Sequence, residues 1–164
     1  MTALPRGLYA ITPDETDTER LLALVQAALQ GGAAIVQYRN KQADSALRRE
    51  QALALLPLCR RAGVPLIVND DLDIAVAIDA DGLHLGADDG DLAAARAALG
   101  PGKLLGASCY DRLELAIEAR DRGADHVAFG AVFPSSTKPG AVRAPLTLFG
   151  QAPSAVGLPA GAIG

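Results

Sequence analysis

Short apolar runs and amphipathic stretches alternate along the whole chain, and this alternation limits the folds that the chain can adopt. The apolar runs have the length of buried strands, and most stretches between them have the 3.6-residue period of a helix. Predicted strands cover residues 8–11, 33–38, 65–68, 82–85, 104–108 and 127–130, and a seventh begins within 158–163. Predicted helices cover residues 17–30, 45–62, 72–78, 92–99 and 111–122, with a weaker one at 146–152. The pattern indicates repeated βα units around a parallel sheet.

A local repeat favours a barrel over an open sheet. Asp79-Ala-Asp-Gly-Leu-His-Leu-Gly86 resembles Gly123-Ala-Asp-His-Val-Ala-Phe-Gly130, and each combines a helix end, an aspartate and a buried strand. An open doubly wound sheet would normally carry a glycine-rich phosphate loop after its first strand. Here Ile11 is followed by Thr-Pro-Asp-Glu. We therefore expect an α/β fold of the (β/α)8 TIM-type barrel class.

The number of βα units is smaller than a full barrel requires. Six units are clear and a seventh begins, so we expect residues 1–164 to form a single barrel domain that lacks its last unit. Residues 149–158 contain one proline and two glycines and predict a poor sixth helix. Unpaired strand edges favour pairing with another chain, which makes a homo-oligomer one expectation.

Composition and charge exclude several classes of partner. The net charge of −4 gives no basic footprint for nucleic acid, and no apolar run reaches the ~18 residues needed to cross a membrane. The N-terminus has no signal-peptide pattern, and Cys59 and Cys109 match no metal spacing. These features favour a cytoplasmic protein with reduced thiols. Arginines 48, 49, 60 and 61 are expected on the solvated face of one helix.

Polar clusters follow three of the predicted strands. They are Gln37-Tyr-Arg-Asn-Lys41, Asn69-Asp70-Asp71 and the segment Phe133-Pro-Ser-Ser-Thr-Lys138. Because the carboxyl ends of parallel strands face one mouth, these side chains are expected to converge on a ligand. Cations from two loops and carboxylates from a third suit a metal-bound diphosphate.

Each cluster also has a purely structural interpretation. Asp70, with Asp88 or Asp89, could bind Mg²⁺, but these aspartates could equally form turns or helix caps. Arg39 and Lys41 could grip phosphate oxygens or only keep a loop soluble. The hydroxyls of Ser135, Ser136 and Thr137 could form a phosphate cradle. Buried structural roles are favoured for His84, His126 and Cys109, and no Ser-His-Asp arrangement is evident.

The order of the motifs resembles thiamine-phosphate synthase (thiamine-phosphate pyrophosphorylase). The resemblance spans residues 7–164 and rests on six segments in register: Leu8-Tyr-Ala-Ile-Thr12, Gln37-Tyr-Arg-Asn-Lys41, Leu66-Ile-Val-Asn-Asp70, Asp81-Gly-Leu-His-Leu-Gly-Ala-Asp-Asp89, Leu105-Gly-Ala-Ser108 and Gly130-Ala-Val-Phe-Pro-Ser-Ser-Thr-Lys-Pro139. It implies a barrel transferase that joins 4-amino-2-methyl-5-pyrimidinylmethyl diphosphate to thiazole phosphate and releases pyrophosphate with the help of Mg²⁺.

The resemblance also implies roles for individual residues. Positions matching the pyrimidine diphosphate site are Gln37, Tyr38, Arg39, Asn40, Lys41, Asn69, Ser108 and Lys138, of which Arg39, Lys41, Ser108 and Lys138 would be catalytic. Asp70 and Asp89 match the Mg²⁺ ligands, and only the family register selects Asp89 over Asp88. Ser135, Ser136 and Thr137 match the loop that binds the thiazole phosphate.

Two alternatives remain open from the sequence. One is a thiazole tautomerase-like isomerase on the same barrel, which would not need the full diphosphate grip; retention of Arg39, Lys41, Asp70, Asp89 and Lys138 argues against it. The other is a truncated, non-catalytic copy that binds phosphates. The family has a glycine pair after its seventh strand and a further loop after its eighth, whereas this sequence stops at Gly164. The diphosphate half of the site is therefore expected to be complete, and the thiazole half is in question.

Overall fold

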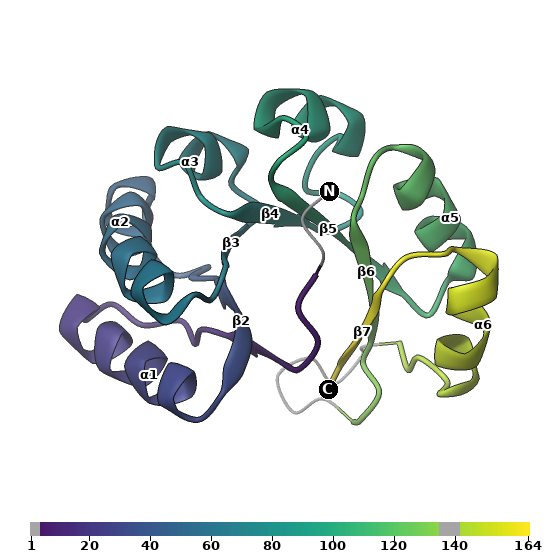
Figure 1. The fold of residues 1–164 in the computed structure, drawn as a ribbon, viewed down its shortest axis with the longest axis horizontal. Coiled ribbons are helices and arrows are strands. Elements are labelled where there is room, and N and C mark those ends of the chain that lie inside the picture. Colours follow the sequence, from purple (N-terminus) through teal and green to yellow (C-terminus); the bar gives the residue numbers. More distant parts are fainter. Residues whose placement is uncertain (1–3, 135–141) are drawn as a thin grey trace. The chain divides into compact units, whose positions relative to one another are not determined.

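A computed structural model describes residues 4–134 and 142–164 and confirms the alternation of strands and helices (Figure 1). The strands in the described residues are β1 (Leu8–Ile11), β2 (Ala33–Tyr38), β3 (Leu66–Asn69), β4 (Gly82–Leu85), β5 (Leu104–Tyr110), β6 (His126–Gly130) and β7 (Ala160–Ile163). The helices are α1 (Thr18–Gln30), α2 (Ser45–Ala62), α3 (Leu72–Ala77), α4 (Leu92–Leu99), α5 (Leu113–Asp121) and α6 (Thr147–Ala155). The predicted α/β class is confirmed, and most predicted bounds are within two residues of those observed.

The chain separates into two compact units, the first ending at His84 and the second beginning at Leu85. In the first unit, β1 to β4 pair in parallel and in chain order. Helices α1, α2 and α3 cover one side of these strands (Figure 1). The middle strand β3 is fully buried over its first three residues, because neighbours lie on both edges and helices on one face. The prediction of a single domain stays a prediction.

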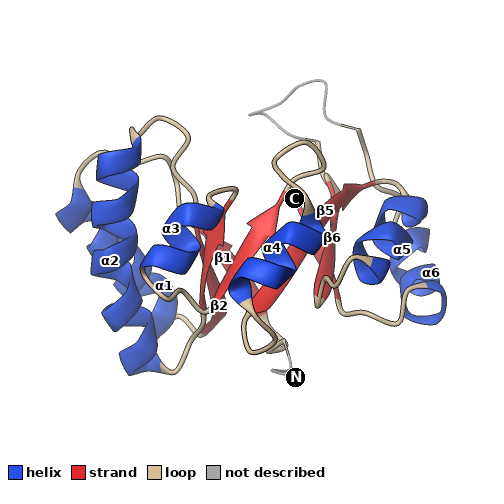
Figure 2. Ribbon diagram, turned by 90° about the horizontal axis from the view of Figure 1, so that it is seen from above, coloured by secondary structure: helices blue, strands red, loops and turns tan. Residues whose placement is uncertain are grey.

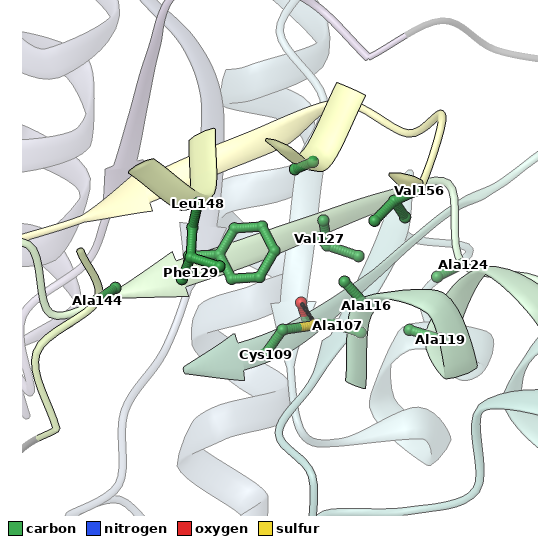
Figure 3. Packing of buried hydrophobic residues seen from close by; sticks show 11 residues of the cluster. Ala107, Cys109, Ala116, Ala119, Ala124, Val127, Phe129, Ala144, Leu148 and Val156 are labelled. Atoms are coloured by element: carbon green, nitrogen blue, oxygen red, sulfur yellow. Dashed lines mark hydrogen bonds between the residues drawn. The ribbon is translucent and has the colours of Figure 1, made fainter. Parts of the chain in front are cut away.

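In the second unit, β5, β6 and β7 pair in parallel, and α5 and α6 lie on the same side of β5 and β6 (Figure 2). A buried apolar cluster holds these elements together, and its larger members include Val127, Phe129 and Leu148 (Figure 3). Phe129 contacts Phe149 of α6 edge-to-face, with ring centroids 5.8 Å apart and an interplanar angle of 89°. Side chains small enough for close packing, such as Ala107 and Ala116, let helix and sheet approach each other.

Helix ends are fixed by residues that lie next to them in the sequence. The side chains of Asp17, Asp44 and Asp91 cap α1, α2 and α4 by accepting a backbone N–H bond. Gly63 ends α2 in the left-handed conformation, with a φ of 68° that favours glycine. Pro57 lies inside α2 without ending it.

Two expectations were wrong in detail. β1 is not a buried strand, because Leu8 is 61% and Ile11 43% exposed. Arg48 does not project freely into solvent, as described below. The weaker helix predicted at residues 146–152 is confirmed as α6 and continues through Pro153, since Leu148, Ala152 and Val156 bury against the core of the second unit and offset the lost backbone bond. None of the described helices is long and apolar enough to span a membrane.

Candidate functional site

A small pocket opens where β2 and β3 end in the first unit. Its lining comes from the ends of β2 and β3, the loop after β2, the first turn of α2 and the start of α3, and consists of Tyr38, Asn40, Lys41, Arg48, Val68, Asn69, Asp70, Asp71 and Ile74. Water can occupy about 30 Å³ of it, roughly enough for two molecules. Five predicted site residues therefore meet here: Tyr38, Asn40, Lys41, Asn69 and Asp70.

The loop after β2 is fixed by side chains that follow β1. The hydroxyl of Thr12 accepts from the backbone N–H of Arg39 and donates to its carbonyl, both at 2.9 Å. Asp14 Oδ1 accepts from the Lys41 backbone N–H at 2.8 Å and pairs with Arg39 Nη1 at 3.3 Å. Neither Thr12 nor Asp14 was identified from the sequence as part of the site, although both stand directly after a predicted strand.

Residues of β2 point alternately to opposite sides, but this alternation does not extend to Lys41. Gln37 is buried and donates from Nε2 to the Tyr9 hydroxyl at 3.1 Å, and burial raises the pKa of Tyr9 above its ordinary value. Tyr38 and Asn40 instead both contact Gln51 of α2. The alternation stops with the strand at Tyr38, so Lys41 reaches the pocket beside Tyr38 and Asn40 rather than lying with Gln37.

Asp70 stands at the end of β3 in a left-handed conformation, with a φ of 61° that aspartate tolerates better than most residues. Its backbone N–H donates to the carbonyl of His84 at 2.9 Å, which ties this turn to β4. Its Oδ2 accepts from Asn69 Nδ2 at 2.6 Å and lies 3.4 Å from Lys41 Nζ. The predicted cation and carboxylate loops are thus in direct contact.

Arg48 is a pocket residue that the sequence interpretation missed. Its Nη2 lies 3.5 Å from Asp71 Oδ2, while Asp71 also caps α3 through the backbone N–H of Ile74. Burial in this region raises the pKa of Tyr38, and the positive charge of Arg48 opposes that rise. The position of Arg48, in the first turn of the helix that follows the loop, was the signal available in the sequence.

Two predicted residues lie in the second unit. Asp89 is exposed in the turn after β4, and its backbone N–H donates to the carbonyl of Gly86 at 3.3 Å. Its carboxylate lies so close over Gly86 that a Cβ at that position would overlap it. Ser108 is half-buried on β5 and is in register with Ala128 of β6. The predicted Ser135, Ser136, Thr137 and Lys138 lie outside the described residues.

The histidines and cysteines are buried in the framework. Burial lowers the pKa of His84 to about 4 and raises the pKa values of Cys59 to about 11 and Cys109 to about 12. A thiol of this kind is protonated and unreactive at neutral pH. Across residues 4–134 and 142–164, no three His, Cys, Asp or Glu side chains gather in a group suited to a metal.

Comparison with known proteins identifies the family of this chain. The family model described as thiamine monophosphate synthase matches residues 8–164. A thiamine-phosphate synthase of Methylobacillus flagellatus is 62% identical over 159 residues, covering 97% of this chain and 76% of the relative. One from Aromatoleum aromaticum is 58% identical with the same coverage.

Solved structures agree. A thiamine phosphate pyrophosphorylase from Pyrococcus furiosus superposes with a TM-score of 0.83 at 36% identity, covering 96% of this chain and 74% of the other. This match, together with the parallel strands, confirms the predicted TIM-type barrel class. The resemblance in sequence motifs, the fold and the close relatives all agree, and the chain belongs to the thiamine monophosphate synthase family of transferases.

Proposed function

We propose that this chain joins 4-amino-2-methyl-5-pyrimidinylmethyl diphosphate to thiazole phosphate, giving thiamine phosphate and pyrophosphate. Family membership supports the reaction, and the pocket supports the diphosphate half of it. The observation that carries the proposal is the contact between Lys41 and Asp70, 3.4 Å apart, where β2 and β3 end. A cation and a carboxylate side by side can bind a diphosphate and the divalent cation that neutralises it.

The reaction exchanges one bond to the pyrimidinylmethyl carbon for another. The bond to the diphosphate oxygen breaks, its electron pair leaves with pyrophosphate, and the thiazole nitrogen forms the new C–N bond. Negative charge grows on the leaving group and positive charge on the electron-rich pyrimidine. Arg39, Lys41 and Lys138 are proposed to stabilise the leaving group electrostatically. The thiazole nitrogen has a free electron pair, so the reaction needs no general base.

The donor set suits Mg²⁺. Asp70 presents a half-buried carboxylate of hard oxygens, and Asp89 offers a second, exposed one. Mg²⁺ keeps several waters and commonly takes one or two protein carboxylates plus phosphate oxygens, so two aspartates are sufficient. When bound, the ion would neutralise charge on the diphosphate. Because Lys41 already contacts Asp70 Oδ2, we expect its ammonium group to move from the carboxylate to a phosphate oxygen as substrate binds.

The remaining predicted residues complete the proposed site. Gln37, Tyr38, Asn40, Asn69 and Ser108 would surround the pyrimidine diphosphate, although Gln37 and Tyr38 are buried and their polar groups already have partners within the protein. These two are therefore expected to shape the site more than to grip the ligand. Ser135, Ser136 and Thr137 would hold the thiazole phosphate. The expected ligands are small molecules.

Substitution of Arg39 tests the proposal. We expect Arg39→Ala to weaken binding of the pyrimidine diphosphate about 10- to 100-fold, because a charged hydrogen bond of roughly 1.5–3 kcal/mol is lost, and to leave the affinity for thiazole phosphate within about twofold. Calorimetric titration with each substrate, with and without Mg²⁺, measures both affinities. Release of pyrophosphate from the two substrates together measures turnover.

Arg49→Ala is the matched control, since Arg49 carries the same charge but is exposed on α2. Equal losses for both substrates would contradict the role of Arg39. Mg²⁺-dependent binding of the diphosphate by the unaltered chain without any turnover would instead favour the non-catalytic alternative.

A further inference from the structure

A buried polar network lies behind the loop that carries Arg39 and Lys41. Its centre is Gln51, a fully buried residue of α2. Gln51 Oε1 accepts from the Tyr38 hydroxyl at 2.8 Å and from Asn40 Nδ2 at 3.1 Å. Its Nε2 donates to the carbonyl of Glu15 at 2.9 Å. One amide group thus connects the end of β2, the loop after β2 and the loop after β1.

Asn40 links this network to the loop of residues 39–43. Its Nδ2 also donates to the Glu15 carbonyl, at 2.6 Å, and its Oδ1 accepts from the backbone N–H groups of Gln42 at 3.3 Å and Ala43 at 3.2 Å. The residues on either side of Asn40 are the two cations. Fixing Asn40 therefore fixes the direction from which both cations leave the backbone.

The network needs the chemistry of an amide at position 51. Two donors converge on one oxygen, and the neighbouring carbonyl requires a donor in return. A carboxylate would supply the acceptor but face the Glu15 carbonyl without a proton, and an apolar side chain would leave buried polar groups without partners. An interior polar residue with every group satisfied restricts the backbone to one arrangement.

We propose that Gln51 is a positioning residue that orders the loop of residues 39–43 for diphosphate binding. This inference rests on the proposed function for its ligand. Gln51 itself is buried beneath the loop and acts through Asn40. Removing its amide should therefore affect the diphosphate side of the reaction and spare the affinity for thiazole phosphate.

The test compares Gln51→Met with Leu55→Met. Leu55 is fully buried one helical turn further along α2, and its apolar side chain makes no hydrogen bond to the loop, so this control alters the core of the same helix without removing a polar group. Amide hydrogen exchange of the ligand-free protein is measured at residues 39–43, where several N–H groups bond to side chains. We expect exchange about tenfold faster in Gln51→Met and unchanged in Leu55→Met.

Calorimetry and kinetics then separate positioning from general destabilisation. In Gln51→Met we expect the Kd for the pyrimidine diphosphate to rise about tenfold and the KM for thiazole phosphate to stay within about twofold. Unchanged exchange at residues 39–43, or equal effects on both substrates, would overturn the inference. Failure of the unaltered chain to bind the diphosphate would overturn the proposed function instead. If Gln51→Met does not fold, Gln51→Glu keeps the shape and the acceptor, and should show the same selective loss.

Discussion

The segments 79–86 and 123–130 are the two copies of the repeat, and both use an aspartate to join neighbouring strands. In each, an aspartate just before a strand accepts a backbone N–H bond from the preceding strand: Leu66 donates to Asp81 Oδ2 at 3.0 Å, and Leu105 donates to Asp125 Oδ2 at 2.8 Å. The backbone N–H of each aspartate donates back to the carbonyl of the same leucine. Each aspartate therefore pairs two neighbouring strands at their amino ends.

The two segments differ in the arginine that accompanies the aspartate. Arg96 of α4 makes an ion pair with Asp125 and also donates to the carbonyls of Gly100, Lys103 and Gly123. Arg60 of α2 is more exposed, and its Nε lies 3.9 Å from Asp81.

The first residue of the repeat explains why the two sequences diverge. Asp79 and Gly123 both have left-handed backbones, with φ values of 55° and 93°. Asp79 uses its carboxylate and carbonyl to bind Arg60. At Gly123 a Cβ would come within 3.1 Å of the Arg96 side chain. The first position of the repeat therefore carries an aspartate at residue 79, where Arg60 lies at the surface. It carries a glycine at residue 123, where the Arg96 side chain occupies the space that a Cβ would need.

Of the substitutions that test this comparison, removal of Asp125 is expected to lower the free energy of unfolding most. We expect Asp125→Ala to lower the free energy of unfolding by about 3 kcal/mol, because Arg96 loses its counter-charge and the Leu105 N–H its acceptor. Urea denaturation measures the change. Asp121→Ala, an exposed aspartate at the end of α5, is the control and should cost less than about 0.5 kcal/mol.

Exchange of the first repeat residue tests the steric explanation. Gly123→Asp should destabilise by about 2 kcal/mol, because it adds a side chain to a left-handed residue and displaces Arg96. Gly102→Asp, in open space on the surface of the same unit, is the control. A Gly123→Asp protein as stable as the control would refute the role given to Arg96.

Removal of Asp81, the counterpart of Asp125 in the first unit, should lower the free energy of unfolding less. Asp81→Ala is expected to cost about 1.5 kcal/mol, since it removes a charged hydrogen bond to the Leu66 N–H but only a distant contact with Arg60. Thermal and urea unfolding, run beside Asp125→Ala, give the difference between the two segments. A loss as large as that of Asp125→Ala would show that the arginines contribute equally.

Much of the fold could be predicted because its signals are local. The caps at Asp17, Asp44 and Asp91, the glycine at Gly63 and the apolar periods of the helices all lie within a few residues of the ends that they define. The clusters at Gln37–Lys41 and Asn69–Asp71 were placed correctly because strand ends in a parallel sheet share one edge.

The missed residues depend on partners far away in sequence. Gln51 has the same local pattern as any polar residue of an amphipathic helix, and only packing places its amide against Tyr38 and the Glu15 carbonyl. Arg48 resembles its neighbour Arg49, yet one contacts Asp71 and the other is exposed. Local periodicity carries no information about such pairings.

The sequence alone determined the order of strands and helices, the family and the two loops that bring cations and carboxylates together. These follow from chain-local preferences and from the one common direction of parallel strands. The tertiary structure decided which side chains hold those loops, that Lys41 contacts Asp70, and why one repeat carries aspartate where the other carries glycine. Each of these depends on contacts within about 4 Å between residues distant in the chain, which form only once the elements pack.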